Sequence, residues 1–428
     1  MIQETLYLRY LKLILLLFLT AGFVGGCGKH DNELAYALNQ AGSNRTELEQ
    51  VLEHYQNDSL KLKAAEFLIR NMPYHVGIHE WIDDPQGRSY KFDLGVLGID
   101  DEILKSRMDS LSACGYRVRT EKRRDIEVIS ADYLIENIDL AFEAWQKPWS
   151  RCFSFDDFCR YILPYRVANE PLCSLRGEMQ RRYLHLLDSV GFTKPGDACM
   201  FLSDMLKERY TYAGFSPTYP SVEEMDETGR SNCEGLAIFY AFFLRAVGIP
   251  VVVDCTVWAK KTHGHAWCAM LDENRKYQTF SGGDTDFEKF RLIFSKRRKI
   301  IPPKVYRRTY EIHHPDIVME DDGYRTFLKN PSYQDVTASY YNPFFDLKVT
   351  LPLEIGEKDS YIYLCGSKTN NYQALALGER KGRECVVKNV VGDNNFIIAE
   401  CRDGVNLNFL TEVFYVDSLG RMTEGMQE

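Results

Sequence analysis

Hydrophobic positions recur with helical spacing through much of the first half of the chain. Leu48, Val51 and Tyr55 lie three or four residues apart and predict a short amphipathic helix, and a second follows before Met72. The stretch from there to about residue 127 shows no clear period. Further helices are predicted at residues 130–145, 155–163, 174–187 and 197–210, and a polar loop at 211–232.

The pattern changes after residue 232. An apolar helix is predicted at 233–247, and Gly248 and Pro250 end it. Short apolar runs rich in β-branched and aromatic residues then predict three strands, at 251–258, 265–271 and 276–280. This order predicts a helix packed on a sheet.

Beyond about residue 300 the hydrophobic period becomes two. Strands are predicted at 345–353, 360–366, 395–401 and 412–418, separated by Gly, Asn and Asp. The predicted fold class is therefore α+β, with a helical region before the helix-and-sheet core and a small all-β, sandwich-like domain after it. We expect four segments: a signal peptide at 1–27, a mostly helical region at 28–170, the core at 171–300 and the β domain at 301–428.

Composition and charge narrow the class of protein. Hydrophobic residues make up 45% of the 428 positions and charged residues 26%, as in ordinary globular proteins. The net charge of −9 does not favour a nucleic-acid surface for the chain as a whole. A basic run at 296–308 contains Pro302 and Pro303, so we interpret it as an exposed linker between domains rather than a binding surface.

The N-terminus has the architecture of a signal peptide: Arg9 and Lys12, an apolar run at 13–24, then Gly25-Gly26-Cys27. The ending resembles a bacterial lipobox, which implies cleavage before Cys27 and acylation of that cysteine. Lipid chains would hold the protein on a membrane of the bacterial envelope, the outer membrane in our interpretation, with the exposed face left open. A permanent transmembrane anchor and simple secretion are the alternatives.

Metal-site spacings are absent from the sequence. The 12 cysteines include no Cys-x-x-Cys pair, and Glu223, Glu224, Asp226 and Glu227 form a charge run without the spacing of a calcium loop. We predict no metal and no cofactor.

One pair of residues points to chemistry. Cys233 stands at the first turn of a predicted helix, where the helix dipole favours the nucleophilic thiolate. His265 begins the second predicted strand, and a helix packed on a sheet can bring these ends together as a Cys-His pair. The alternative is a buried structural cysteine, which is the interpretation that we give Cys255 and Cys268. Trp258 and Trp267 are likewise predicted to be core residues, and His263 is expected in a solvated turn.

These residues resemble the transglutaminase-like core: Cys233 at a helix start, L-R-A-V-G-I-P-V at 244–251 and G-H-A-W at 264–267. The resemblance covers about residues 210–286. It implies a papain-like fold and a Cys-His-Asp triad that transfers acyl groups from amides to an amine or to water. By this resemblance Cys233 is the nucleophile and His265 the general base. The family's Asp position falls on Ser281, so Asp284 is the candidate third member and Asp286 the second choice.

The sequence thus leads to an envelope-anchored cysteine enzyme that cleaves or transfers amide-linked acyl groups of a peptide or protein, with hydrolysis preferred over cross-linking. Ser281 in the Asp position motivates an alternative, a non-catalytic lipoprotein with a degraded core that binds glycan or peptide through its β domain.

Overall fold

The structure is a computed structural model that describes residues 32–90, 101–259, 264–281, 301–313, 326–352, 361–368, 371–401 and 406–426. The chain divides into two compact units. One comprises Met1–His75 and Arg123–Ile138, and the other comprises Val76–Lys122 and Asp139–Glu428. This division does not test the four segments expected from the sequence, which remain a prediction.

The first unit is helical. Leu48 and Val51 of α2 and Leu68 of α3 are fully buried, which confirms the two amphipathic helices. The Asp58 side chain accepts hydrogen bonds from the first backbone N–H groups of α3 and so fixes where that helix begins. The elements of this unit are a helix at 32–40, η1 (Gly42–Asn44), α2 (Arg45–His54), α3 (Ser59–Asn71), η2 (Met72–Tyr74) and α6 (Asp125–Val128).

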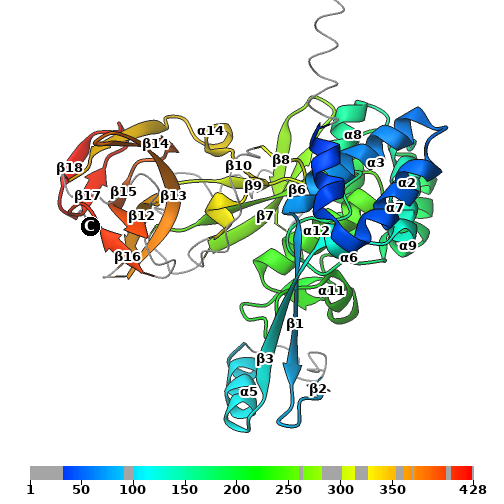
Figure 1. Cartoon of the computed structure of the whole chain (residues 1–428), viewed down its shortest axis with the longest axis horizontal. Helices are drawn as coiled ribbons and strands as arrows, with labels where there is room; N and C mark the ends of the chain where they lie inside the picture. Colours follow the sequence, from blue (N-terminus) through cyan, green and yellow to red (C-terminus); the bar gives the residue numbers. More distant parts are fainter. Residues whose placement is uncertain are drawn as a thin grey trace, which may run out of the picture. The chain divides into compact units, whose positions relative to one another are not determined.

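The second unit contains the core expected from the sequence, in which α12 lies against the strands β6 and β7 of a sheet (Figure 1). Every residue of α12 from Gly235 onward is buried. The helices that lead up to this sheet are α7 (Ala131–Trp145), which starts in the first unit, α8 (Phe155–Tyr161), α9 (Arg176–Val190), α10 (Pro195–Leu206), α11 (Val222–Thr228) and α12 (Cys233–Ala246), and α14 (Thr337–Tyr340) follows it. The five-stranded sheet has the order β10-β9-β6-β7-β8.

Three strands of this sheet confirm the sequence prediction: β6 (Val251–Val257), β7 (Gly264–Leu271) and β8 (Tyr277–Phe280). Two were not expected, β9 (Tyr306–Arg308) and β10 (Tyr333–Asp335), and they extend the core sheet beyond residue 300. All neighbouring strands in it are antiparallel. The described part of residues 233–280 therefore folds as predicted into a helix followed by a sheet.

Two predictions about loops are wrong. The segment predicted as a polar loop at 211–232 contains the short helix α11, which the Ser221 side chain caps, and a two-stranded parallel pair, β4 (Thr211–Tyr212) with β5 (Arg230–Ser231). The basic run is not an exposed linker over its described part. Lys304, Arg307 and Arg308 are at most 9% exposed, because each is paired with a carboxylate inside the unit.

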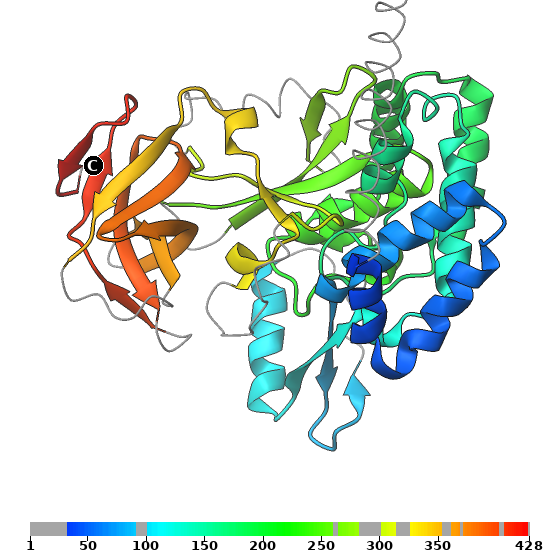
Figure 2. The ribbon, with the colours of Figure 1, turned by 45° about the horizontal axis from the view of Figure 1, so that its top comes forward.

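The stretch without a clear period forms a projecting arm of the second unit. Its sheet has the order β2-β1-β3, and α5 lies beside it (Figure 2). Glu80 of β1 accepts a hydrogen bond from the backbone N–H of Tyr219, and Asp101 of α5 accepts one from Gly214. The arm thus holds the loop that leads to Cys233. Its elements are β1 (Val76–Asp83), β2 (Ser89–Tyr90), α5 (Asp101–Ala113) and β3 (Arg117–Arg124).

The small all-β domain is confirmed, and its strands form one curved antiparallel sheet rather than the two packed sheets of a sandwich (Figure 2). Leu347, Leu364 and Phe396 are among the residues of its apolar core. The hairpin of β13 and β14 was not expected from the sequence. The strands are β11 (Phe345–Thr350), β12 (Tyr361–Lys368), β13 (Asn371–Lys381), β14 (Glu384–Val390), β15 (Asn394–Cys401), β16 (Leu407–Phe409), β17 (Phe414–Val416) and β18 (Met422–Glu424).

Within the part of the chain that the structure describes, no helix is long and apolar enough to cross a membrane. The signal peptide and Cys27 lie outside the described residues.

Candidate active site

Cys233 is the first residue of α12, as the sequence predicts. The helix starts there because the Asn232 side chain accepts a hydrogen bond from the Gly235 N–H at 3.0 Å. Gly235 has no room for a side chain, since a Cβ at this position would lie 2.0 Å from Ser231 Oγ and 2.8 Å from Pro220 Cβ. The tight packing of the preceding loop on the first turn fixes the position of the thiol.

The Cys233 thiol lies against the strand that carries His265. The backbone N–H of Ala266 donates to the sulfur, and Ala266 directly follows His265 in β7. Cys233 is half-buried. Burial raises the pKa of its thiol above the ordinary value, and the N–H donors of Ala266 and of the first turn of α12 offset only part of that rise. In these surroundings the thiol needs a proton acceptor to become a nucleophile.

His265 lies between two indole rings. Its ring centroid is 6.4 Å from that of Trp258, with the planes nearly parallel, and 5.7 Å from that of Trp267. Trp267 is fully buried and Trp258 nearly so, which confirms both as core residues. They also limit the orientations open to the imidazole.

A buried polar network supports this pair of indoles. Trp267 donates to the Tyr340 hydroxyl at 2.8 Å, and Tyr340 donates to Asp254 at 2.5 Å. Asp254 is fully buried and receives two hydrogen bonds from Arg307, each of 2.8 Å. The Arg307 guanidinium lies over the ring of Tyr277, 3.5 Å from its centroid. This network links the side chains of strands β6, β7, β8 and β9 beside the indole rings that contact His265.

The third triad position is not described in full. Ser281 is half-buried and directly follows β8, whereas Asp284, Asp286 and His263 lie outside the described residues. Phe280 pairs with Cys268 in the antiparallel β7/β8 ladder. At Phe280 the chain therefore runs toward the end of β7 that carries His265.

Two residues beside Cys233 were missed by sequence reasoning. Tyr212 of β4 is 63% exposed and close enough to the thiol for an electrostatic interaction, because the β4/β5 pairing sets it opposite Ser231. Glu234 follows the cysteine and receives a hydrogen bond of 2.6 Å from Arg308 of β9 and one of 3.1 Å from the Tyr219 hydroxyl. Burial alone would raise the pKa of Glu234, but the guanidinium holds it below its ordinary value.

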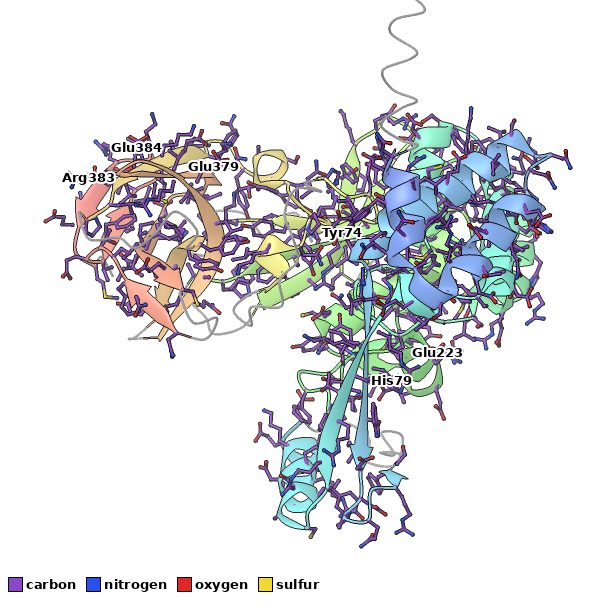
Figure 3. All side chains as sticks on the ribbon, in the orientation of Figure 1. Tyr74, His79, Glu223, Glu379, Arg383 and Glu384 are labelled. Carbon is purple, nitrogen blue, oxygen red and sulfur yellow. The ribbon has the colours of Figure 1, made fainter. Side chains whose placement is uncertain are left out.

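The acidic run near the site has structural roles. Asp226 binds Arg182 through two hydrogen bonds of 2.9 Å and accepts another from the Tyr210 hydroxyl. Glu223 of α11 and His79 of β1 lie close to each other (Figure 3), and burial raises the pKa of Glu223.

The residues that the structure describes include no group of three or more His, Cys, Asp or Glu side chains that could hold a metal ion.

Comparison with protein families identifies the class of this core. Residues 185–301 match the family model described as the Transglutaminase-like superfamily, so the body that brings Cys233 to the strand of His265 is a transglutaminase-like domain. No curated protein and no solved structure matches the chain.

Proposed function

We propose that this protein is a transglutaminase-like cysteine enzyme that acts on amide-linked acyl groups of a peptide or protein, with water as the preferred acceptor. The observation that carries the proposal is the contact of the Cys233 thiol with the backbone N–H of Ala266, next to His265, inside a transglutaminase-like domain. The reaction class follows from this pair of residues.

In the proposed reaction His265 takes the thiol proton as the sulfur of Cys233 attacks the carbonyl carbon of the amide. The C–N bond of the tetrahedral intermediate breaks, His265 returns the proton to the leaving amine, and a thioester remains. Water then attacks the thioester with His265 as base, which releases the acid and restores the thiol. The backbone N–H of Cys233 at the start of α12 is the proposed donor to the oxyanion.

The raised pKa of Cys233 supports general-base activation in particular. A thiol that burial keeps protonated gains most from a base that removes its proton as the bond to carbon forms. Asp284 is the proposed partner that orients the imidazole, since it follows by four sequence positions Phe280, where the described chain runs toward the His265 end of β7.

The test uses casein as a general substrate, with peptide release for hydrolysis and dansylcadaverine incorporation for amine transfer. We expect wild type to release peptides and Cys233→Ala to release none. Cys152→Ala, which removes an exposed thiol outside the site, is the matched control and should retain activity. Full turnover by Cys233→Ala would refute the proposal.

A second candidate function is binding without catalysis. The rings of Tyr372 and Phe409, 4.7 Å apart, lie on the β domain with Phe409 half-exposed, and such aromatic surfaces suit glycan or peptide ligands. Ligand binding that Phe409→Ala abolishes, in a protein whose Cys233→Ala variant behaves as wild type, would favour this candidate.

A further inference from the structure

The buried guanidinium of Arg308 has donors for which the described residues supply no strong acceptor. Arg308 is 9% exposed, and its Nη2 donates to Glu234 at 2.6 Å. Nε and Nη1 have no hydrogen-bond acceptor among the described residues, apart from the weakly accepting Cys255 thiol beside the guanidinium. An unsatisfied buried donor on a charged group is costly, and in native proteins it indicates a missing partner.

The Arg308 guanidinium lies in the neighbourhood of Cys233, since it binds the adjacent Glu234. Arg308 pairs with Val253 in the β9/β6 ladder, and Cys255 of β6 pairs with Ala266 of β7, whose N–H meets the Cys233 thiol. The backbone at Arg308 thus lies two strand spacings across the sheet and two residues along it from that at Ala266, a distance of about 12 Å. The guanidinium reaches back across part of this distance to the Cys255 thiol.

Solvent reaches the groups around the guanidinium. The Glu234 side chain is 31% exposed, and Tyr219, Tyr333, Cys255 and Cys233 are all partly exposed. Nε and Nη1 are themselves covered, so a bound group that approaches from the side of the thiol reaches them only when a covering side chain moves.

Charge selects the kind of acceptor. Glu234 already neutralises Arg308. A second carboxylate bound to Nε or Nη1 would be repelled by the negative charge of Glu234. A neutral amide carbonyl satisfies the free N–H groups without adding charge. Since an extended peptide advances about 3.4 Å per residue, a carbonyl at Arg308 would lie within about three residues of the one that Cys233 attacks.

We propose that Arg308 is a substrate-binding residue that donates to a main-chain carbonyl oxygen of the peptide substrate, within about three residues of the attacked amide. The inference rests on the proposed function of Cys233 and adds a class of substrate, an extended peptide on the acyl or leaving side. Glu234 holds the guanidinium in place through their ion pair.

The experiment compares two alkylating probes of Cys233 in the full chain, read by peptide mass spectrometry. Bromoacetyl-glycylglycinamide carries additional carbonyls, and N-pentylbromoacetamide has a similar length without them. The ratio of their rate constants at one pH cancels the ionised fraction of the thiol. We expect a ratio of about ten or more in wild type, as for one charge-assisted hydrogen bond.

The variants locate the effect. The ratio should fall to about one in Arg308→Met and also in Arg308→Lys, which keeps the charge for Glu234 but not the extra donors. Arg160→Met, which removes a more exposed arginine paired with Glu311, is the matched control and should keep the wild-type ratio. If Arg308→Met fails to fold, Arg308→Lys decides.

A ratio near one in wild type, or one unchanged in Arg308→Lys, would overturn the proposal and leave water as the occupant of the free donors. Faster reaction of the carboxylate probe bromoacetyl-glycylglycine than of its amide would overturn the choice of a neutral acceptor. The ratio reports binding only, so it is independent of the turnover by which the proposed function is tested.

Discussion

At the scale of single residues, burial works against the chemistry proposed for Cys233, and the histidine must compensate for it. Desolvation raises the pKa of the thiol, and the backbone N–H donors around the sulfur do not reverse this. A helix start alone, from which the sequence suggested an activated thiolate, is therefore insufficient here. Because the thiol depends on a base to remove its proton, the two indoles of Trp258 and Trp267 that restrict the His265 ring matter for the proposed chemistry.

Orientation of the imidazole leads to a prediction about the third triad residue. We expect Asp284→Asn to lower the rate of peptide release from casein by about 10³-fold or more, because the amide favours the wrong imidazole tautomer and no longer stabilises the imidazolium. Asp286→Asn is the matched control and should stay within a few-fold of wild type. The reverse order of effects would assign the role to Asp286, and two unaffected variants would exclude an aspartate at this position.

A second residue-scale prediction concerns acid stability. Burial alone raises the pKa of Asp335, but the Lys304 ammonium outweighs it and holds the pKa below its ordinary value. A carboxyl with a lowered pKa stabilises the fold above its ordinary value of about 3.9, and this stabilisation is lost as the pH falls through the lowered value.

Urea unfolding of Asp335→Asn tests this. The variant should lose about 3 kcal/mol near pH 7, because Lys304 remains buried without its carboxylate, and the difference from wild type should shrink below about pH 4. A difference that does not change with pH would show that Asp335 is not ionised in the folded protein.

At the scale of elements, the start of α12 depends on a residue without a side chain. Gly235→Ala would force a Cβ into Ser231 and Pro220, and we expect a loss of about 1–3 kcal/mol in unfolding free energy together with displacement of the thiol. Gly196→Ala in α10 is the matched control. Its Cβ would meet only Met270 at 3.8 Å, so this variant should be as stable as wild type or more stable. Equal stability of both variants, from urea midpoints, would contradict this description of the first turn.

The secondary-structure elements differ in how well the sequence predicts them. The order from α12 to β8 carries strong local signals: an apolar helix, the stop at Gly248 and Pro250, and apolar strands. β3 carries none, because seven of its eight residues are charged, polar or Thr and most of its side chains are exposed. The basic run was misread for a related reason, since charged residues predict a solvated surface unless their buried partners are known.

Those partners lie far apart in the sequence. Arg308 and Glu234 are separated by 74 positions and Arg307 and Asp254 by 53, so their pairing follows from the sheet order and not from local pattern. The positions of Cys233 at a helix start and of His265 near the start of a strand were predictable from their own elements. Several residues that support them were not, since Tyr212, Arg308 and Tyr340 come from β4, β9 and the helix at Thr337–Tyr340.

At the scale of the whole molecule, the transglutaminase-like domain is one part of the chain, and the arm and the β domain belong to the same compact unit. The arm holds the loop before Cys233 through Glu80 and Asp101. Arg308 lies on β9, which belongs to the core sheet but follows residues 185–301 in the sequence. Segments outside the family match thus take part in the site.

The lipid anchor is also a prediction at this scale. We expect cells that express the chain with an epitope tag to incorporate radiolabelled palmitate into it, and Cys27→Ser to abolish the label and release the protein from the membrane fraction. Cys114→Ser, which alters an exposed cysteine of the body, should keep the label. Labelled Cys27→Ser protein would refute acylation at this residue.

The central claim, that His265 activates Cys233, is tested most directly by the pH dependence of Cys233 alkylation with iodoacetamide. Peptide mass spectrometry separates this cysteine from the others in wild type and in His265→Ala. We predict measurable labelling of wild type near neutral pH, and a shift of the His265→Ala profile to clearly more alkaline pH, because the thiol, whose pKa burial raises, then has no imidazole to take its proton. Superimposable profiles that both rise only at alkaline pH would contradict the activated pair and favour the binding function.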